Sequence, residues 1–192
     1  MENLREPLES GKISIARAAY RSTYPASFIL IAAMNPCPCG YLGDIANPAR
    51  CRCTPDQIVR YRGKLSGPLL DRIDIHVEVP RVPQALLTAP TPKKELASED
   101  IRAQVEAVQS TQTKRQGVLN SKLSVKQIDQ LCVLDTASQQ LIDRAMEQLG
   151  LSARGYHRIL KLARTIADLQ ESEHINQQHL AQAIQLRSLD RR

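Results

Sequence analysis

Apolar and polar positions in the first part of the chain predict strands and a hairpin. Residues 12–25 (KISIARAAYRSTYP) alternate around a turn-sized middle, which predicts a β-hairpin with Arg17 near its tip. Residues 28–34 (FILIAAM) form a short continuous apolar run, typical of a strand buried on both faces of a parallel sheet. Residues 73–79 (IDIHVEV) alternate and stop at a proline, which predicts an edge strand.

Helix signals lie on both sides of these strands. Thr54, Pro55 and Gln57 have the spacing of a capped helix start with a capping box, which predicts a helix over residues 54–65. Residues 2–10 are typical of the last turns of a helix already under way. One buried strand and one edge strand cannot build a parallel sheet, so we expect the chain to begin partway through a fold.

The second part of the chain is predicted to be helical throughout. Polar residues typical of N-caps open five successive segments, at Ser98, Ser124, Asp135, Ser152 and Asn176. The first of these helices should run to Gly117 and the third to Gly150. The fourth, over residues 153–169, carries one apolar stripe at positions 156, 159, 160, 163 and 166.

The expected fold class is therefore a partial α/β core followed by an all-α helical bundle. The α/β part covers residues 1–82 and contains a cysteine-rich loop at 37–53. A proline-rich linker at 83–97 precedes the helical domain at 98–192.

Composition changes this picture only modestly. The 192 residues carry a net charge of +6, which suits an anionic partner such as nucleic acid without demanding one. Residues 50–64 hold five basic side chains against Asp56 alone. With one Phe and no Trp, aromatic stacking on bases is not the expected binding mode. Apolar runs are too short to span a membrane and no secretory signal is present, which favours a cytoplasmic protein.

Four of the five cysteines lie in one loop with the spacing C-x-C-x₁₁-C-x-C, at Cys37, Cys39, Cys51 and Cys53. Four thiolates are a complete ligand set for tetrahedral zinc, although structural sites usually leave two or more residues between paired ligands. Four reduced thiols in a surface loop are the alternative. Cys132 lies on an apolar helical stripe and is predicted to be core.

Four segments together resemble the C-terminal half of the magnesium-chelatase-like AAA+ ATPases. They are REPLESGKISIARA, PASFILIAAMNPCPCG, CRCTPDQIVRYRGKLSGPLLDRIDIHVEVP and LSARGYHRILKLARTIADL, and they cover nearly the whole chain in order. More distantly, the chain resembles the minichromosome maintenance helicases. It lacks the phosphate-binding loop and the Asp-Glu pair of such ATPases, so we interpret it as a piece of an ATPase that is inactive alone.

The resemblance assigns roles at the nucleotide to two residues of the α/β part. Asn35 would be sensor 1, which orients the attacking water; alternatively it only starts the Asn-Pro turn. Arg72 would be the arginine finger, which reaches a neighbouring subunit's site. The alternative is a surface ion pair with Asp71 or Asp74.

Two further arginines receive roles in the same way. Arg154 would be sensor 2, which contacts bound nucleotide. As a cation in the first turn of a helix it opposes the helix dipole, which favours a bound anion there over a merely solvated side chain. Arg17 stands where the helicases place a basic residue at a DNA-contacting hairpin tip. A solvated turn arginine is the alternative.

The resemblance thus implies a ring-forming ATPase, expected to be a hexamer, that uses ATP and Mg and acts on DNA during uptake (competence) or recombination. A structural zinc would be held by the cysteine loop. Two rival functions stay open: a zinc-dependent nucleic-acid-binding module without ATPase activity, and a metallochelatase subunit that acts on a porphyrin.

Overall fold

The structure is a computed structural model that describes residues 2–17, 20–44, 47–80, 82 and 96–187. The chain divides into two compact units. The first comprises Met1–Ile73 with Glu78–Arg81, and the second comprises Asp74–Val77 with Val82–Arg192. Most of the predicted linker, the two central residues of the hairpin turn and the last five residues of the chain lie outside the described residues.

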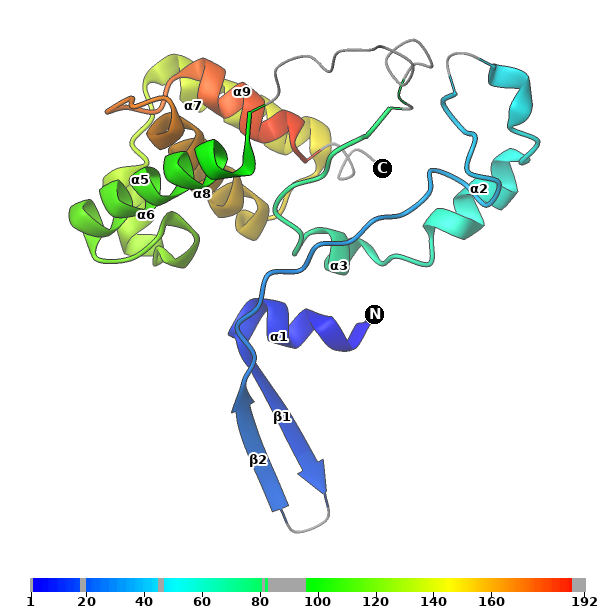
Figure 1. The fold of residues 1–192 in the computed structure, drawn as a ribbon, viewed down its shortest axis with the longest axis horizontal. Coiled ribbons are helices and arrows are strands. Elements are labelled where there is room, and N and C mark those ends of the chain that lie inside the picture. Colours follow the sequence, from blue (N-terminus) through cyan, green and yellow to red (C-terminus); the bar gives the residue numbers. More distant parts are fainter. Residues whose placement is uncertain (1, 18–19, 45–46, 81, 83–95, 188–192) are drawn as a thin grey trace. The chain divides into compact units, whose positions relative to one another are not determined.

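The first unit begins with a short helical segment that leads into the predicted hairpin (Figure 1). A 3₁₀ turn, η1 (Glu2–Leu4), is followed by helix α1 (Arg5–Ser10). Strands β1 (Lys12–Arg17) and β2 (Tyr20–Pro25) then pair antiparallel. Gly11, with φ of 65°, ends α1 in the left-handed region that favours glycine. The hairpin prediction is confirmed.

The other two predicted strands do not form. Residues 28–34 and 73–79 have no regular secondary structure, and the β1–β2 hairpin is the one sheet among the described residues. A strand needs a neighbour to satisfy its backbone hydrogen bonds, and no described segment supplies one. Ile29 and Ile31 are accordingly 89% and 90% exposed. The α/β part is thus a small antiparallel sheet with helices, and these two strand predictions are wrong.

Two helices complete the first unit. Helix α2 (Pro55–Arg62) starts at the predicted capping box: Thr54 Oγ1 accepts from the Gln57 amide, and Gln57 Oε1 accepts from the Thr54 amide. It ends three residues earlier than predicted. Helix α3 (Gly67–Leu70) follows, and it supplies two of the few buried apolar side chains of this unit, Leu69 and Leu70.

The second unit is a bundle of helices, as predicted. Its elements are α5 (Ser98–Gln116), η3 (Asn120–Lys122), α6 (Val125–Leu131), α7 (Thr136–Leu149), α8 (Ala153–Leu169) and α9 (Gln177–Gln185). Four of the five predicted caps are confirmed by side-chain hydrogen bonds. At α5 the cap is Ala97 instead of Ser98, because the Asp100 carboxylate accepts from the Ala97 amide at 3.3 Å.

The core of the bundle surrounds α8. The predicted stripe is confirmed: Ile159, Leu160, Ala163 and Ile166 are buried, and Tyr156 packs against them. Cys132 is 4% exposed in the same core, as predicted, and burial raises the pKa of its thiol to about 11. None of the described helices is long and apolar enough to cross a lipid bilayer.

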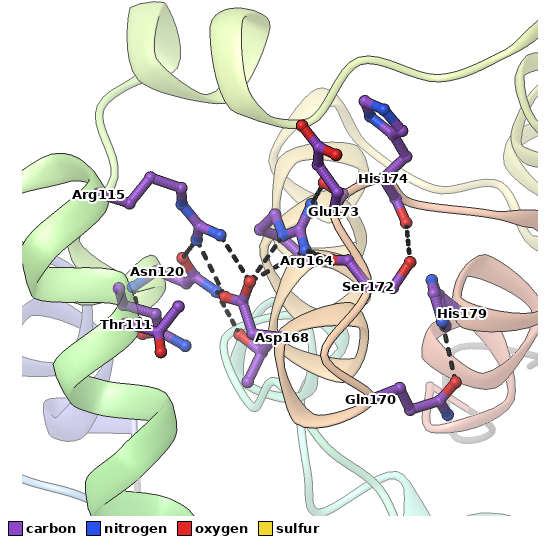
Figure 2. Close-up of polar contacts among 12 residues, drawn as sticks. Thr111, Arg115, Asn120, Arg164, Asp168, Gln170, Ser172, Glu173, His174 and His179 are labelled. Carbon is purple, nitrogen blue, oxygen red and sulfur yellow. Dashed lines mark hydrogen bonds and ion pairs between the residues drawn. The ribbon is translucent and has the colours of Figure 1, made fainter.

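A buried carboxylate on α8 joins three parts of the bundle (Figure 2). Asp168 accepts two hydrogen bonds from Arg115 on α5, at 2.6 and 3.0 Å. It also accepts from Asn120 Nδ2 of η3 at 2.8 Å and from Arg164 Nε at 3.1 Å. Its side chain is 2% exposed, so two guanidinium groups balance a charge that water does not reach.

The same network continues to the turn after α8. The Arg164 guanidinium donates to the carbonyl oxygens of Ser172 and Glu173. His179, 1% exposed, accepts from the Asn176 amide through Nδ1 and therefore donates from Nε2 to Gln170 Oε1 at 2.9 Å. Burial, and then the charge of Arg164, lower the pKa of His179.

Removing the charge of Asp168 should destabilise the protein strongly. Asp168→Asn leaves the buried Arg164 guanidinium without a carboxylate and removes the partner of the partly exposed Arg115, which costs about 3–5 kcal/mol of unfolding free energy. Urea unfolding measures the loss. Asp129→Asn, at an exposed position of α6, is the matched control and should change stability by less than about 0.5 kcal/mol. Equal effects of the two variants would contradict the structural role of Asp168.

Acid should destabilise the bundle in two stages. The unfolded chain binds more protons than the folded one wherever a folded-state pKa is lowered, so stability falls as pH falls. His179 should contribute first, below its ordinary pKa of about 6.5. Asp168 follows at lower pH: burial alone would raise its pKa, but hydrogen bonds from Arg115 and Asn120 and the charge of Arg164 lower it overall.

Unfolding measured at about pH 7 and about pH 5 tests the first stage. His179→Gln keeps a capping side chain at the third position of α9 and removes the titration, so its stability should vary less over this interval. An unchanged pH dependence in this variant would contradict the assignment to His179.

Candidate functional site

The four cysteines of the loop converge on one point. Cys37 Sγ lies 3.3 Å from Cys39 Sγ and 3.8 Å from Cys51 Sγ, and the Cys39 and Cys51 sulfurs are 3.7 Å apart. All four sulfurs, including that of Cys53, lie within 4.8 Å of one another. Ligands around tetrahedral zinc, at about 2.3 Å from the metal, are about 3.8 Å from each other. The donor set and its spacing therefore fit a four-thiolate metal site.

The pKa values of the cysteine thiols in the loop differ from one another. Burial raises the pKa of Cys37, but hydrogen bonds from the Cys39 side chain and from the amides of Leu42 and Cys39 outweigh it and lower the pKa to about 6. For Cys53, a backbone hydrogen bond at Cys39 lowers the pKa, but its hydrogen bond with the Cys39 side chain, burial and the charge of Cys37 raise it to about 12. A thiolate at Cys37 therefore raises the pKa of Cys53.

The sequence around the loop holds the cysteines in place. The Gly40 amide donates to the Cys37 carbonyl in a tight turn, and Gly40 has a φ of 81° that only glycine adopts easily. Arg62, in the last turn of α2, donates from Nε to the Pro36 carbonyl at 3.0 Å. Cys37, between these contacts, is fully buried.

Asn35 lies directly before the cysteine loop. Its side chain is exposed and lies beside the turn at Gly40, where a Cβ atom would be 3.7 Å from Asn35 Nδ2. Because residues 28–34 form no strand, Asn35 does not end a sheet strand as predicted. Its role at a nucleotide stays a prediction.

Arg72 lies just after α3 and is held by two groups of the first unit. Its Nη1 donates to the Pro68 carbonyl at 2.6 Å, and Nε and Nη2 both donate to the Glu9 carboxylate. The ion pair is with Glu9, a residue 63 positions away that no sequence pattern links to it. Asp74, one of the two partners considered from the sequence, pairs with Arg158.

Arg154 lies where the sequence predicted, in the first turn of α8. Ser152 caps this helix by accepting from the Gly155 amide, and the Arg154 side chain is exposed. One turn later on the same helix, Arg158 forms its ion pair with Asp74. Within the second unit, this ion pair thus connects α8 to residues 74–77, which follow shortly after Arg72 in the sequence.

Arg17 is the last residue of β1 and pairs in register with Tyr20 across the hairpin end. Its side chain is exposed. Asn35, Arg72, Arg17 and the four cysteines all belong to the first unit, and Arg154 belongs to the second. Among these residues, the structure brings together the four cysteines with Asn35 beside their loop.

Two family models match the chain. Magnesium chelatase, subunit ChlI, matches residues 1–87, and the C-terminal model of the same subunit matches residues 95–187. YifB of Salmonella typhimurium is 42% identical over 191 residues, which is 100% of this chain and 37% of YifB. Competence protein ComM of Haemophilus influenzae is 44% identical over 191 residues, which is 100% of this chain and 36% of ComM.

An uncharacterised Mycobacterium tuberculosis protein is 34% identical over 173 residues, which is 88% of this chain and 33% of that protein. The chain thus spans little more than a third of the length of these relatives. The two family models between them cover both units, and the first two relatives match from end to end. The chain belongs to the magnesium-chelatase-like family, in the group that contains YifB and ComM.

Proposed function

We propose that the chain forms part of a longer ring-shaped ATPase and supplies residues to its nucleotide sites. Arg72 is the arginine finger, Asn35 is sensor 1 and Arg154 is sensor 2. The observation that carries the proposal is the end-to-end similarity to YifB and ComM, which are much longer than this chain. In this structure the Arg72 guanidinium is bound by the Pro68 carbonyl and the Glu9 carboxylate, so the proposal requires it to exchange Glu9 for the phosphate when the ring binds nucleotide.

The proposed substrate of the ring is DNA. One relative carries the name competence protein. Competence is the ability of a cell to take up DNA, so a ring with this role would act on DNA. The exposed Arg17 at the hairpin end is suited to contacts with phosphates, which are independent of sequence and sensitive to salt. ATP and Mg would be bound jointly by this chain and the rest of the ATPase.

The cysteine cluster supports a structural zinc, held by Cys37, Cys39, Cys51 and Cys53. Because all four positions are protein thiolates, the metal would have no open position and would serve to fix the loop. The same cluster favours the second candidate function, a zinc-dependent nucleic-acid-binding module that works without ATP.

The Arg72 assignment is tested in the full-length ATPase. Arg72→Ala should lower ATP hydrolysis by about 10³- to 10⁵-fold and leave ATP binding nearly intact, because a finger acts on the transition state. Arg144→Ala, at an exposed position of α7, is the control and should leave turnover unchanged. Mixed rings of Arg72→Ala with a phosphate-loop variant should regain part of the activity. Hydrolysis by Arg72→Ala at the unmodified rate in assembled rings would overturn the assignment.

The metal assignment is tested on this chain. Elemental analysis of protein purified without chelator should find about one zinc per chain. Cys37→Ser should release the metal and raise amide hydrogen exchange in residues 37–53, whereas Cys132→Ala should retain it because that thiol lies in the other unit. Metal-free protein with slow exchange in this loop would contradict a zinc site.

A further inference from the structure

A strongly basic segment lies against the cysteine cluster. We define the basic loop surface as Arg50, Arg52, Arg60, Arg62 and Lys64. The described residues 36–44 and 47–64 add only two carboxylates, Asp44 and Asp56. Neither the hairpin nor the proposed nucleotide residues account for this concentration of charge.

Part of the surface is hollowed. Cys39, Tyr41, Asn47, Ala49, Arg50 and Arg52 line a solvent-open depression of about 520 Å³. The Arg50 guanidinium lies over the Tyr41 ring, 4.2 Å from its centroid. Arg50 also forms an ion pair with the Asp44 carboxylate at 3.8 Å, and more than a third of its side chain stays exposed beside these two contacts.

The remaining cations continue the surface along α2. Arg62 joins the helix to the start of the loop through the Pro36 carbonyl, while Arg60 and Lys64 are exposed. Arg60 and Arg62 both lie in the last turn of α2, and Lys64 follows two residues after the helix. Guanidinium groups bind phosphate oxygens through pairs of hydrogen bonds, and an ammonium group binds them as a point charge.

We propose that the basic loop surface binds the phosphodiester backbone of nucleic acid, as a contact separate from the hairpin. It would hold DNA through phosphates and without base selection.

Two structural roles compete with this one. A zinc ion with four thiolates carries a formal charge of about −2 that arginines can balance. Arg60 and Arg62 also complement the dipole at the end of α2. Both of these roles predict loss of metal or helix on neutralisation, and neither predicts loss of DNA binding.

The test is binding of this chain to labelled single-stranded DNA, the same duplex DNA and single-stranded RNA, between about 50 and 200 mM salt. The surface variant carries Arg52→Gln, Arg60→Gln and Lys64→Gln. Because these substitutions remove three cations that would neutralise phosphates, its salt slope on single strands should be less steep by about 2, and affinity should fall about tenfold or more at the lowest salt. Zinc content and thermal unfolding should stay unchanged. The three arms identify which nucleic acid the surface prefers.

The control variant has the same net charge. It carries Arg102→Gln, Lys114→Gln and Lys126→Gln, all at exposed positions of the helical unit. Its affinity should change by less than about twofold, because these substitutions lower the overall positive potential of the protein without removing a contact to the nucleic acid. Equal weakening by both variants, or no weakening by the surface variant, would overturn the proposal. Equal competition by polyglutamate would point to an acidic protein partner and would overturn it too.

The unmodified protein gives a second readout, in case the surface variant loses its metal. DNA should protect Lys64 from amine acylation more than it protects Lys126, as measured by mass spectrometry. Equal protection would contradict the proposal. If the chain binds no nucleic acid at about 50 mM salt, the surface assignment fails. The proposed ATPase role is then still decided by the Arg72 experiment, which does not depend on this surface.

Discussion

The helical unit depends on the buried carboxylate of Asp168. Two guanidinium groups and one amide converge on it from α5, η3 and α8 itself, so three elements can pack only in the arrangement that satisfies this charge. The apolar stripe of α8 supplies the apolar surface that this helix buries, but apolar contacts alone do not fix the rotation of the helix about its axis. The network thereby fixes α8 within its unit, and α8 carries Arg154 at its first turn.

The first unit is held together in another way. It has few buried apolar residues, and its best-defined contacts are polar: the sulfur cluster, the Arg62 contact with Pro36 and the Glu9 pair of Arg72. Most of the apolar residues 28–34 remain exposed because a strand is stabilised by neighbouring strands, which no described segment provides. The unit therefore presents its proposed functional groups on local scaffolds of loop, hairpin and short helix.

Local signals in the sequence were sufficient for most helices and for the hairpin. Side chains such as Thr54 and Asp135 cap helices through neighbours three residues away, so their chemistry can be read directly from spacing. The prediction of a strand at 28–34 failed because the stability of a strand depends on partners that are distant in the sequence. The contact of Arg115 with Asp168, across 53 residues, left no local signal either. The cysteine spacing did predict a cluster, because only eleven residues separate its two pairs.

We propose that this chain completes the nucleotide sites of a longer ATPase. A structure of the full-length protein assembled with a non-hydrolysable ATP analogue tests it most directly. In that structure we expect Arg72 to have left Glu9 and to contact the terminal phosphate bound by the neighbouring subunit, with Asn35 and Arg154 also at bound nucleotide. Arg72 still paired with Glu9, while other residues surround the terminal phosphate, would contradict it.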